Sequence, residues 1–211
     1  MPTDVIFWLV VLGLSVILHE VAHGYMANYL GDPTARLGGR LTLNPLVHID
    51  PLGTVILPLF LFLTGSSILI GYAKPVPYNP YNIKAKNGEA LVAFAGPGTN
   101  ILLALIFGLA LRFGGSYMGD SLAQAFLLIA QINVFLAIFN LIPIPPLDGS
   151  KVLPVLLPAT LRRGYDSMRH SFERLGVFSG TLVLLIVFYF LSPLFSGLVS
   201  GALALLVGYP Y

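Results

Sequence analysis

The chain has 211 residues, of which 56% are hydrophobic and only 9% are charged. Since a soluble domain carries about a quarter charged residues, this composition indicates a polytopic membrane protein and excludes an ordinary water-soluble enzyme. The formal net charge is only +2 and cysteine is absent, which argues against a nucleic-acid partner and excludes disulfides, thiolate nucleophiles and cysteine-ligated metals.

Apolar segments follow one another along the chain, at residues 5–30, 52–72, 89–113, 121–142 and 177–208. A helix that crosses the bilayer needs about 20 residues, so the first, third and fourth segments qualify plainly. The last contains a central Pro193 and is either one kinked helix or two shorter pieces. We expect an all-α polytopic membrane protein, a bundle of about 4–6 transmembrane helices, in which residues 1–211 form a single integral-membrane domain. The first segment lacks a basic n-region and a small-residue cleavage site, so we expect no cleavable signal peptide.

The first apolar segment carries the pattern His19-Glu20-Val21-Ala22-His23. On a helix His19 and His23 are i and i+4, so both imidazoles leave the same face and can hold one Zn²⁺. Glu20 lies beside them, where a general base for a metal-activated water would be. The alternative is that both histidines make interhelical hydrogen bonds and Glu20 is a neutral acid. Ionisable groups inside a spanning helix are costly, which favours the functional interpretation.

Residues 34–43 place Gly38-Gly39 between two short alternating arms. This pattern predicts either a short membrane-associated β-hairpin with a two-residue turn or an ordinary loop. Further along, His48 either lies near the metal site as a hydrogen-bond donor or caps a loop together with Asp50.

The fourth apolar segment ends in a proline-rich run, Asn140-Leu-Ile-Pro-Ile-Pro-Pro-Leu-Asp148-Gly149. Its prolines forbid continued helix, and irregular backbone at membrane depth survives only where it lines a cavity or is packed in protein. Asp148 is therefore delivered near the membrane edge on a rigid segment. An Asp-Gly pair after prolines is by itself only a turn, but together with the two histidines it suits a third zinc ligand that leaves a fourth position for water. Asn140 is either an oxyanion donor or a helix C-terminal cap.

The metal ligands constrain the topology. At about 1.5 Å per residue, His19 lies about 22 Å along a helix that starts near Asp4, past the bilayer midplane. Asp148 must reach the same side, so residues 52–72 should leave and re-enter that side as a re-entrant segment. Of the 11 Lys and Arg residues, only Arg112 then lies on the opposite side. This positive-inside bias predicts that the metal side is cytoplasmic.

Together these residues resemble the site-2 protease family of intramembrane zinc metalloproteases, over nearly the whole chain. The features that match are the segments His19–His23, Asn140–Gly149, Ala95-Gly96-Pro97-x-x-Asn100, Gly71–Pro77 and Asn44–Pro51. The resemblance implies about one zinc per chain, held by His19, His23 and Asp148 with Glu20 as the base. Many relatives add a PDZ or CBS domain, and neither fits in this chain.

The resemblance also implies hydrolysis of peptide bonds in or next to the transmembrane segments of membrane-protein substrates within the lipid bilayer. It implies a multi-pass integral protein of a prokaryotic plasma membrane with its active site toward the cytoplasm. The alternatives are a divalent-cation (zinc) transporter and a catalytically inactive membrane scaffold. Ligands that gather toward one side, with 89–113 and 121–142 poor in charge, favour a closed site over a transport path. The sequence leaves open the identity of the substrate, the cleavage site and the oligomeric state.

Overall fold

The computed structural model describes residues 2–50, 74–174 and 176–208, and these residues form helices and loops without a strand. Four long helices carry the architecture: α1 (Pro2–Tyr29), α4 (Gly88–Gly114), α5 (Asp120–Asn140) and α8 (Gly176–Val207). The shorter elements are α2 (Thr34–Leu37), η1 (Pro45–His48), η3 (Pro80–Asn82), η4 (Gly115–Tyr117), α6 (Gly149–Leu156) and α7 (Ala159–Arg174).

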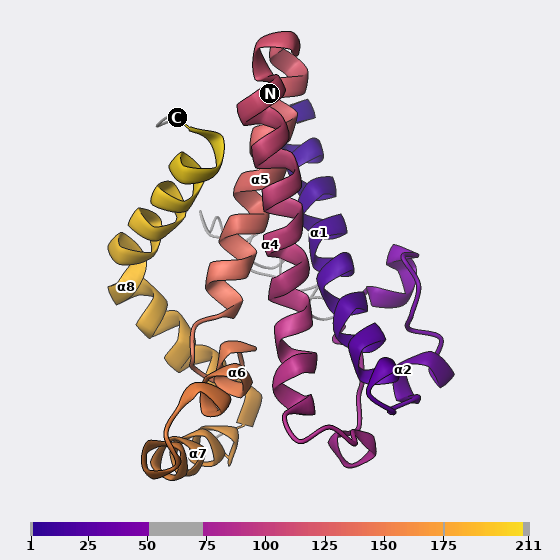
Figure 1. The fold of residues 1–211 in the computed structure, drawn as a ribbon, viewed down its shortest axis with the longest axis vertical. Helices are drawn as coiled ribbons and strands as arrows, with labels where there is room; N and C mark the ends of the chain where they lie inside the picture. Colours follow the sequence, from indigo (N-terminus) through magenta and orange to yellow (C-terminus); the bar gives the residue numbers. More distant parts are fainter. Residues whose placement is uncertain (1, 51–73, 175, 209–211) are drawn as a thin grey trace.

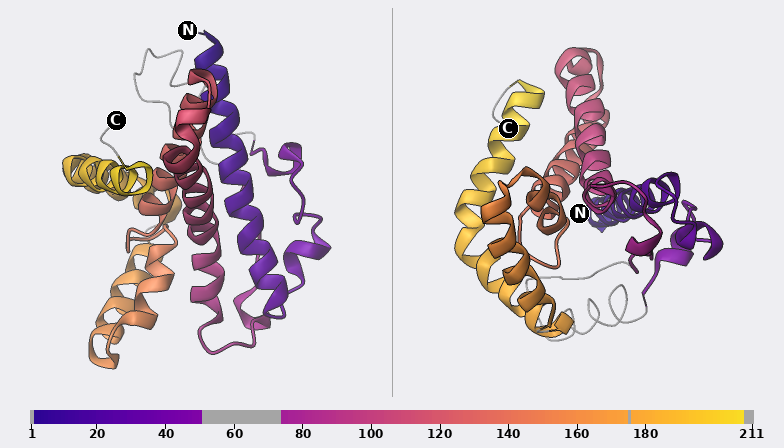
Figure 2. Two further views of the ribbon diagram at one scale, coloured as in Figure 1. Left: turned by 45° about the horizontal axis from the view of Figure 1, so that its top comes forward. Right: turned by 60° about the horizontal axis from the view of Figure 1, so that its bottom comes forward.

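Helices α1, α4 and α5 form the centre of the bundle, with α4 packed against both of the others (Figure 1). An apolar cluster of Val11, Ile132 and Leu136 joins α1 to α5. Helix α8 lies against α4 and α5, and α6 and α7 sit at one end of the bundle (Figures 1 and 2). Within this three-helix centre, α1 presents its histidines to α4.

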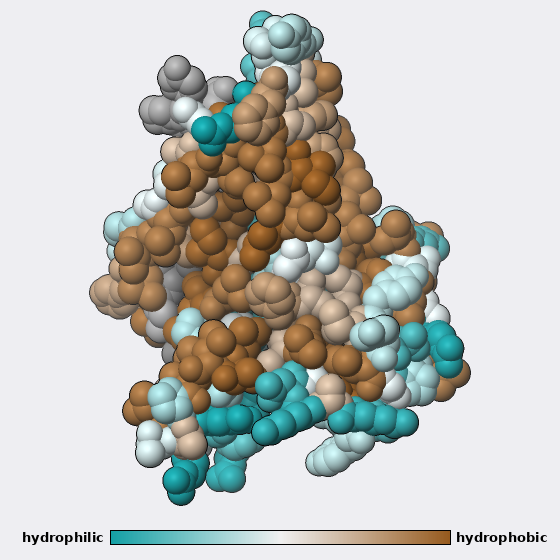
Figure 3. Space-filling model, viewed as in Figure 1, coloured by the Kyte–Doolittle hydropathy of each residue, from teal (hydrophilic) through white to brown (hydrophobic). Residues whose placement is uncertain are grey.

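Within the described residues, four helical segments are long and apolar enough to cross a membrane: Val5–Tyr29, Gly88–Tyr117, Asp120–Asn140 and Tyr189–Val207. On the face shown in Figure 3, the middle of the bundle is largely apolar, while hydrophilic side chains gather toward the end where α7 lies. The prediction of an all-α membrane bundle is confirmed, and α1, α4 and α5 match the apolar segments 5–30, 89–113 and 121–142.

The last apolar segment is one helix, because α8 continues through Pro193. Figure 1 shows this helix bent near its middle. Proline has no amide hydrogen and its ring crowds the preceding turn, so a bend at this point is expected.

Of the two alternatives for residues 34–43, a short β-hairpin or an ordinary loop, the hairpin does not form, because Thr34–Leu37 form the short helix α2. The Gly38-Gly39 pair ends this helix instead of turning a hairpin. Gly39 has a φ of 65°, the Arg40 amide donates to Ala35 O at 2.9 Å, and the Gly39 amide donates to Arg36 O at 3.1 Å. This is the Schellman arrangement, in which a left-handed glycine closes the last turn. A Gly-Gly pair suits either structure, and the helical hydrogen bonds from residue 34 onward decide between them.

The predicted re-entrant segment 52–72 lies outside the described residues. The residues that flank it are described, and they meet: the Lys74 amide donates to His48 O at 2.9 Å. The chain therefore enters and leaves residues 51–73 at neighbouring points.

Residues 74–84, which we call the strap, follow this gap and lie along the end of α1 before α4 begins. Its contacts begin at Lys74 and end where the Lys84 amide donates to Leu30 O at 3.3 Å. Between these ends Asp32, which is fully buried, accepts hydrogen bonds from the Asn79 amide at 2.6 Å and from Asn82 Nδ2 at 2.9 Å. The strap thus joins the end of α1 to the start of α4.

Candidate metal centre

His19 and His23 lie one turn apart on α1, and both are buried, with exposed fractions of 6% and 9%. Helix α4 covers them at the level of Gly96. A Cβ atom at Gly96 would lie 2.4 Å from His23 Nε2 and 2.6 Å from His19 Nε2, closer than real contacts allow. The missing side chain of Gly96 therefore makes the space in which the two imidazoles stand.

Asp148 reaches the histidines from the proline-rich connection between α5 and α6, where it precedes the first turn of α6. This connection is compact, with the Leu147 amide bonded to Ile144 O at 3.0 Å. Gly149 allows the close approach, since a Cβ there would lie 2.2 Å from Leu141 O. The backbone of residues 141–149 thus folds back onto the end of α5 and aims Asp148 at α1.

One atom from each of these three side chains, all candidate metal ligands, consequently lies close to the other two. His19 Nε2 lies 3.0 Å from His23 Nε2, and Asp148 Oδ2 lies 3.2 Å from His19 Nε2 and 3.4 Å from His23 Nε2. Zinc bonds of about 2.0–2.2 Å at tetrahedral angles separate neighbouring ligand atoms by about 3.3 Å. The triangle of these three atoms fits one face of a zinc tetrahedron.

The proton positions on the imidazoles also fit a cation. His23 Nδ1 lies 2.6 Å from Val92 O, a backbone carbonyl that can only accept, so the neutral imidazole carries its proton on Nδ1. His23 Nε2 then carries a lone pair that faces the Asp148 carboxylate. Two acceptors at this distance repel each other unless a cation lies between them. At metal sites, the other ring nitrogen of a ligating histidine usually has a hydrogen-bond partner. His19 Nδ1 has such a partner in Asn100 Oδ1, at 2.6 Å.

Glu20 follows His19 on α1 and faces the strap. Its Oε2 accepts a hydrogen bond from the Val76 amide at 2.9 Å. Val76 itself is buried, and its side chain packs over Gly24, where a Cβ would lie 2.7 Å from Val76 Cγ1. The strap therefore holds the carboxylate of the candidate base in place.

Asn140 and His48 both make hydrogen bonds to nearby backbone carbonyls. Asn140, the last residue of α5, donates from Nδ2 to Leu136 O at 2.9 Å, within its own helix. His48 is buried, and its Nε2 lies 2.9 Å from Thr42 O while its carbonyl accepts from Lys74. His48 thus organises the loop next to the strap, and it is not part of the cluster of His19, His23 and Asp148.

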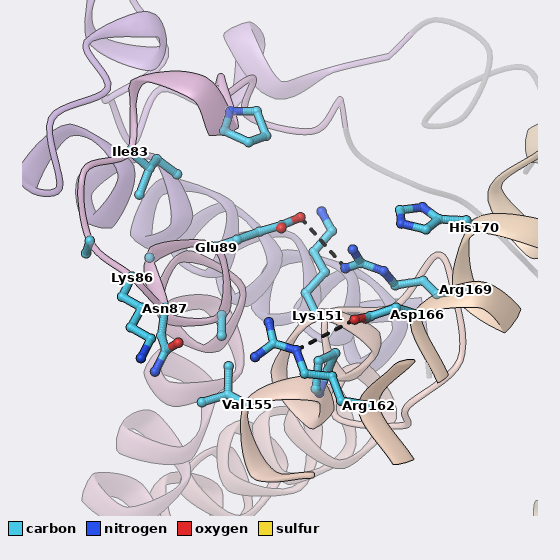
Figure 4. A pocket seen from close by; sticks show the side chains of 15 residues that line it. Ile83, Lys86, Asn87, Glu89, Lys151, Val155, Arg162, Asp166, Arg169 and His170 are labelled. Atoms are coloured by element: carbon cyan, nitrogen blue, oxygen red, sulfur yellow. Dashed lines mark ion pairs between the residues drawn. The ribbon is translucent and has the colours of Figure 1, made fainter. Parts of the chain in front are cut away.

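A polar cavity of about 290 Å³ lies between the start of α4 and helices α6 and α7 (Figure 4). Arg169 faces Glu89 across it at 3.9 Å, and Arg162 lies 3.6 Å from Asp166. Lys151 Nζ donates to Tyr78 Oη of the strap at 2.8 Å. His19, His23 and Asp148 do not line this cavity. The contacts around it link α7 to the start of α4 and α6 to the strap.

Sequence reasoning assigned no role to Asn100 or Val76. Asn100 carried a usable signal, because a fully buried amide inside an apolar span is costly unless it is hydrogen-bonded. Val76 contributes through its backbone amide, for which side-chain identity offers no signal.

Comparison with known proteins gives a consistent result. The model of peptidase family M50 matches residues 7–126 and 109–187. "Putative zinc metalloprotease YwhC" of Bacillus subtilis (strain 168) is 38% identical over 76% of this chain and 74% of that protein. "Putative zinc metalloprotease Rip2" of Mycolicibacterium smegmatis is 34% identical over 74% of this chain but 61% of that protein, so the chain spans less than two thirds of Rip2. No solved structure matches the chain.

Proposed function

Because this chain belongs to peptidase family M50, the site-2 protease family, it is an intramembrane zinc metalloprotease, and we propose that His19, His23 and Asp148 hold its zinc while Glu20 is its general base. The observation that carries this assignment is the triangle of two imidazole nitrogens and one carboxylate oxygen, with sides of 3.0, 3.2 and 3.4 Å. Residues 1–211 act as one integral-membrane metalloprotease domain. The bound metal supplies Lewis acidity, which acidifies a water molecule and polarises the scissile carbonyl.

Glu20 accepts the proton of the attacking water and passes it to the nitrogen of the leaving amine. The Val76 amide engages Oε2 of this carboxylate, so we assign the proton transfer to Oε1. The hydrogen bond to Oε2 keeps the Glu20 carboxylate from rotating between the two proton transfers, so Oε1 stays in position for both.

Asn140 is the proposed side-chain donor to the oxyanion that forms at the scissile carbon. Its Nδ2 carries two protons, and Leu136 O takes one of them. The other proton is the one that would reach the substrate from the end of α5.

The substrate is a transmembrane segment of another membrane protein, which approaches through the lipid bilayer. Such a segment hides its amides in its own helical hydrogen bonds, so it must unwind locally before cleavage, and Gly or Pro near the cut lowers that cost. Hydrophilic side chains gather at the end of the bundle where α7 and its arginines lie (Figure 3), which supports a cytoplasmic position for the active site.

The test is a cleavage assay with purified protein in detergent, a panel of transmembrane substrates, and a zinc chelator. Glu20→Gln should keep its zinc and its fold and lose about 10²–10⁴-fold in cleavage rate, since this is the usual contribution of a general base. A double substitution, His23→Ala with Asp148→Ala, should lose the zinc. Cleavage by Glu20→Gln at the wild-type rate would remove the base assignment, and wild-type zinc content in the double variant would remove the ligand assignment.

A further inference from the structure

Four buried polar side chains form a continuous hydrogen-bonded line through the apolar centre of the bundle. They are Ser15 and His19 on α1, Asn100 on α4 and Asn133 on α5, and the two asparagines are fully buried, at 0% exposure. Isolated amides at this depth would be costly, so each must have a partner. The line ends on a candidate zinc ligand, which suggests that it does more than satisfy polar groups.

A backbone carbonyl of α5 fixes the orientation of the side-chain amides in this line. Asn133 Nδ2 lies 2.9 Å from Ile129 O, a carbonyl that can only accept, so the nitrogen end of the amide must point there. The same nitrogen donates to Ser15 Oγ at 3.0 Å. Asn133 Oδ1 therefore points the other way, toward α4.

The side-chain amide of Asn100 can then take only one orientation. Its Nδ2 donates to Asn133 Oδ1 at 2.8 Å, so its own Oδ1 faces His19 Nδ1 at 2.6 Å. An oxygen in that place requires the proton on Nδ1 of the imidazole. His19 Nε2 is left with the lone pair that points at Asp148.

We propose that Asn133 is a positioning residue, which through Asn100 holds His19 in the tautomer that can bind the metal. The inference rests on the proposed zinc ligation by His19. If Asn100 lost its partner, its amide could turn over and present an N–H group to Nδ1. The His19 proton would then move to Nε2, where it blocks the metal-binding lone pair. His23 needs no such relay, because Val92 O fixes its tautomer directly.

The first test is spectroscopic and needs no metal. In metal-free protein with ¹⁵N-labelled histidine, His19 should show the Nδ1-protonated tautomer in the wild type. Asn133→Leu should shift His19 toward the Nε2-protonated form while His23 is unchanged. A wild-type His19 tautomer in folded Asn133→Leu protein would overturn the proposal.

The second test measures zinc affinity by chelator competition. Asn133→Leu should weaken zinc binding about 10–100-fold, as loss of an outer partner of a ligating histidine usually does. Ile132→Ala, which removes buried side-chain volume from the neighbouring core cluster, is the packing control: it should lower thermal stability and leave zinc affinity at the wild-type value. Equal weakening in both variants would mean that Asn133 acts only through packing.

A rescue variant separates positioning from structure. An aspartate at position 100 loses the hydrogen bond to Asn133 Oδ1 but offers oxygen to His19 in either orientation, so Asn100→Asp should make the His19 tautomer independent of Asn133. In the Asn100→Asp background, adding Asn133→Leu should cost almost no further zinc affinity. The same loss in both backgrounds would refute the relay, and the Asn100→Asp protein keeps this comparison open even if Asn133→Leu alone folds poorly. Retention of zinc by His19→Ala, in contrast, would refute the zinc site itself.

Discussion

The candidate metal centre depends on a glycine as much as on its histidines. His19 and His23 are the proposed zinc ligands on α1, and the space they occupy exists because α4 presents Gly96 to them. A methyl group there would stand 2.4 Å from His23 Nε2, and the imidazoles cannot retreat because Val92 and Asn100 hold their outer nitrogens.

We therefore expect Gly96→Ala to lose most of its zinc while keeping its helices, since alanine favours helix more than glycine does by about 1 kcal/mol. Gly98→Ala is the matched control on the same helix, because a Cβ at Gly98 meets its nearest atom, Phe94 Cε1, at an ordinary 3.4 Å. Zinc content by elemental analysis and helicity by circular dichroism distinguish the two. Normal zinc in Gly96→Ala would show that the described packing of α4 on the histidines is wrong.

At the scale of elements, the strap connects parts of the chain that are distant in sequence. It contacts Glu20 through the Val76 amide, Lys151 through Tyr78 Oη, and Asp32 through Asn79 and Asn82. Asp32 is the anchor of this arrangement. Burial disfavours its charged form, but hydrogen bonds from Asn82, Thr34 and Asn79 outweigh burial and hold the pKa of the Asp32 carboxyl below its ordinary value.

The sign of this shift gives a pH prediction. A carboxyl group whose pKa is lower in the folded state stabilises the protein above its unfolded pKa of about 3.9, and this stabilisation is lost as pH falls through the folded pKa. Asp32→Asn should thus destabilise the protein by roughly 1–3 kcal/mol at pH 7, because one of the two acceptor oxygens becomes an NH2 group that faces a strap donor. The difference from wild type should shrink in the acid range below about pH 4. Thermal unfolding in detergent at both pH values tests this, and a difference that is the same at pH 7 and pH 3 would contradict it.

For the molecule as a whole, the fold determines which residues lie at the same end of the helix bundle. His48, which lies before the undescribed residues 51–73, meets Lys74, the first residue of the strap, through the hydrogen bond between the Lys74 amide and His48 O. Lys84 precedes α4 and Met118 follows η4, so these residues lie at opposite ends of a membrane-spanning segment, Gly88–Tyr117. We expect the Lys84 end, with the metal site and most of the basic residues, to be cytoplasmic.

The absence of cysteine makes this orientation testable. Lys84→Cys and Met118→Cys give two single-cysteine proteins for a membrane-impermeant thiol reagent. The cysteine at 118 should react in intact cells, and the cysteine at 84 only after permeabilisation. The reverse pattern would invert the orientation, and labelling of both in intact cells would mean that Gly88–Tyr117 does not cross the bilayer.

The class of the protein and the three ligand candidates that the fold brings together could be predicted from the sequence. It could do so because both signals are local: apolar runs of spanning length report the bilayer, and an i, i+4 histidine pair needs only a helix to share one face. Asp148 could be named because the prolines before it forbid helix and leave irregular backbone that must be packed.

The groups that surround those candidate ligands could not be predicted from the sequence. Asn100 meets His19 across 81 positions of sequence, and Val76 meets Glu20 across 56. Such contacts depend on how helices pack, which residue periodicity does not encode. The Gly38-Gly39 pair illustrates the same limit at short range, because a left-handed glycine serves a hairpin turn and a Schellman cap equally well. Its role was settled by the helical hydrogen bonds of the preceding turn, which Asp32 helps to organise by accepting from the Thr34 amide.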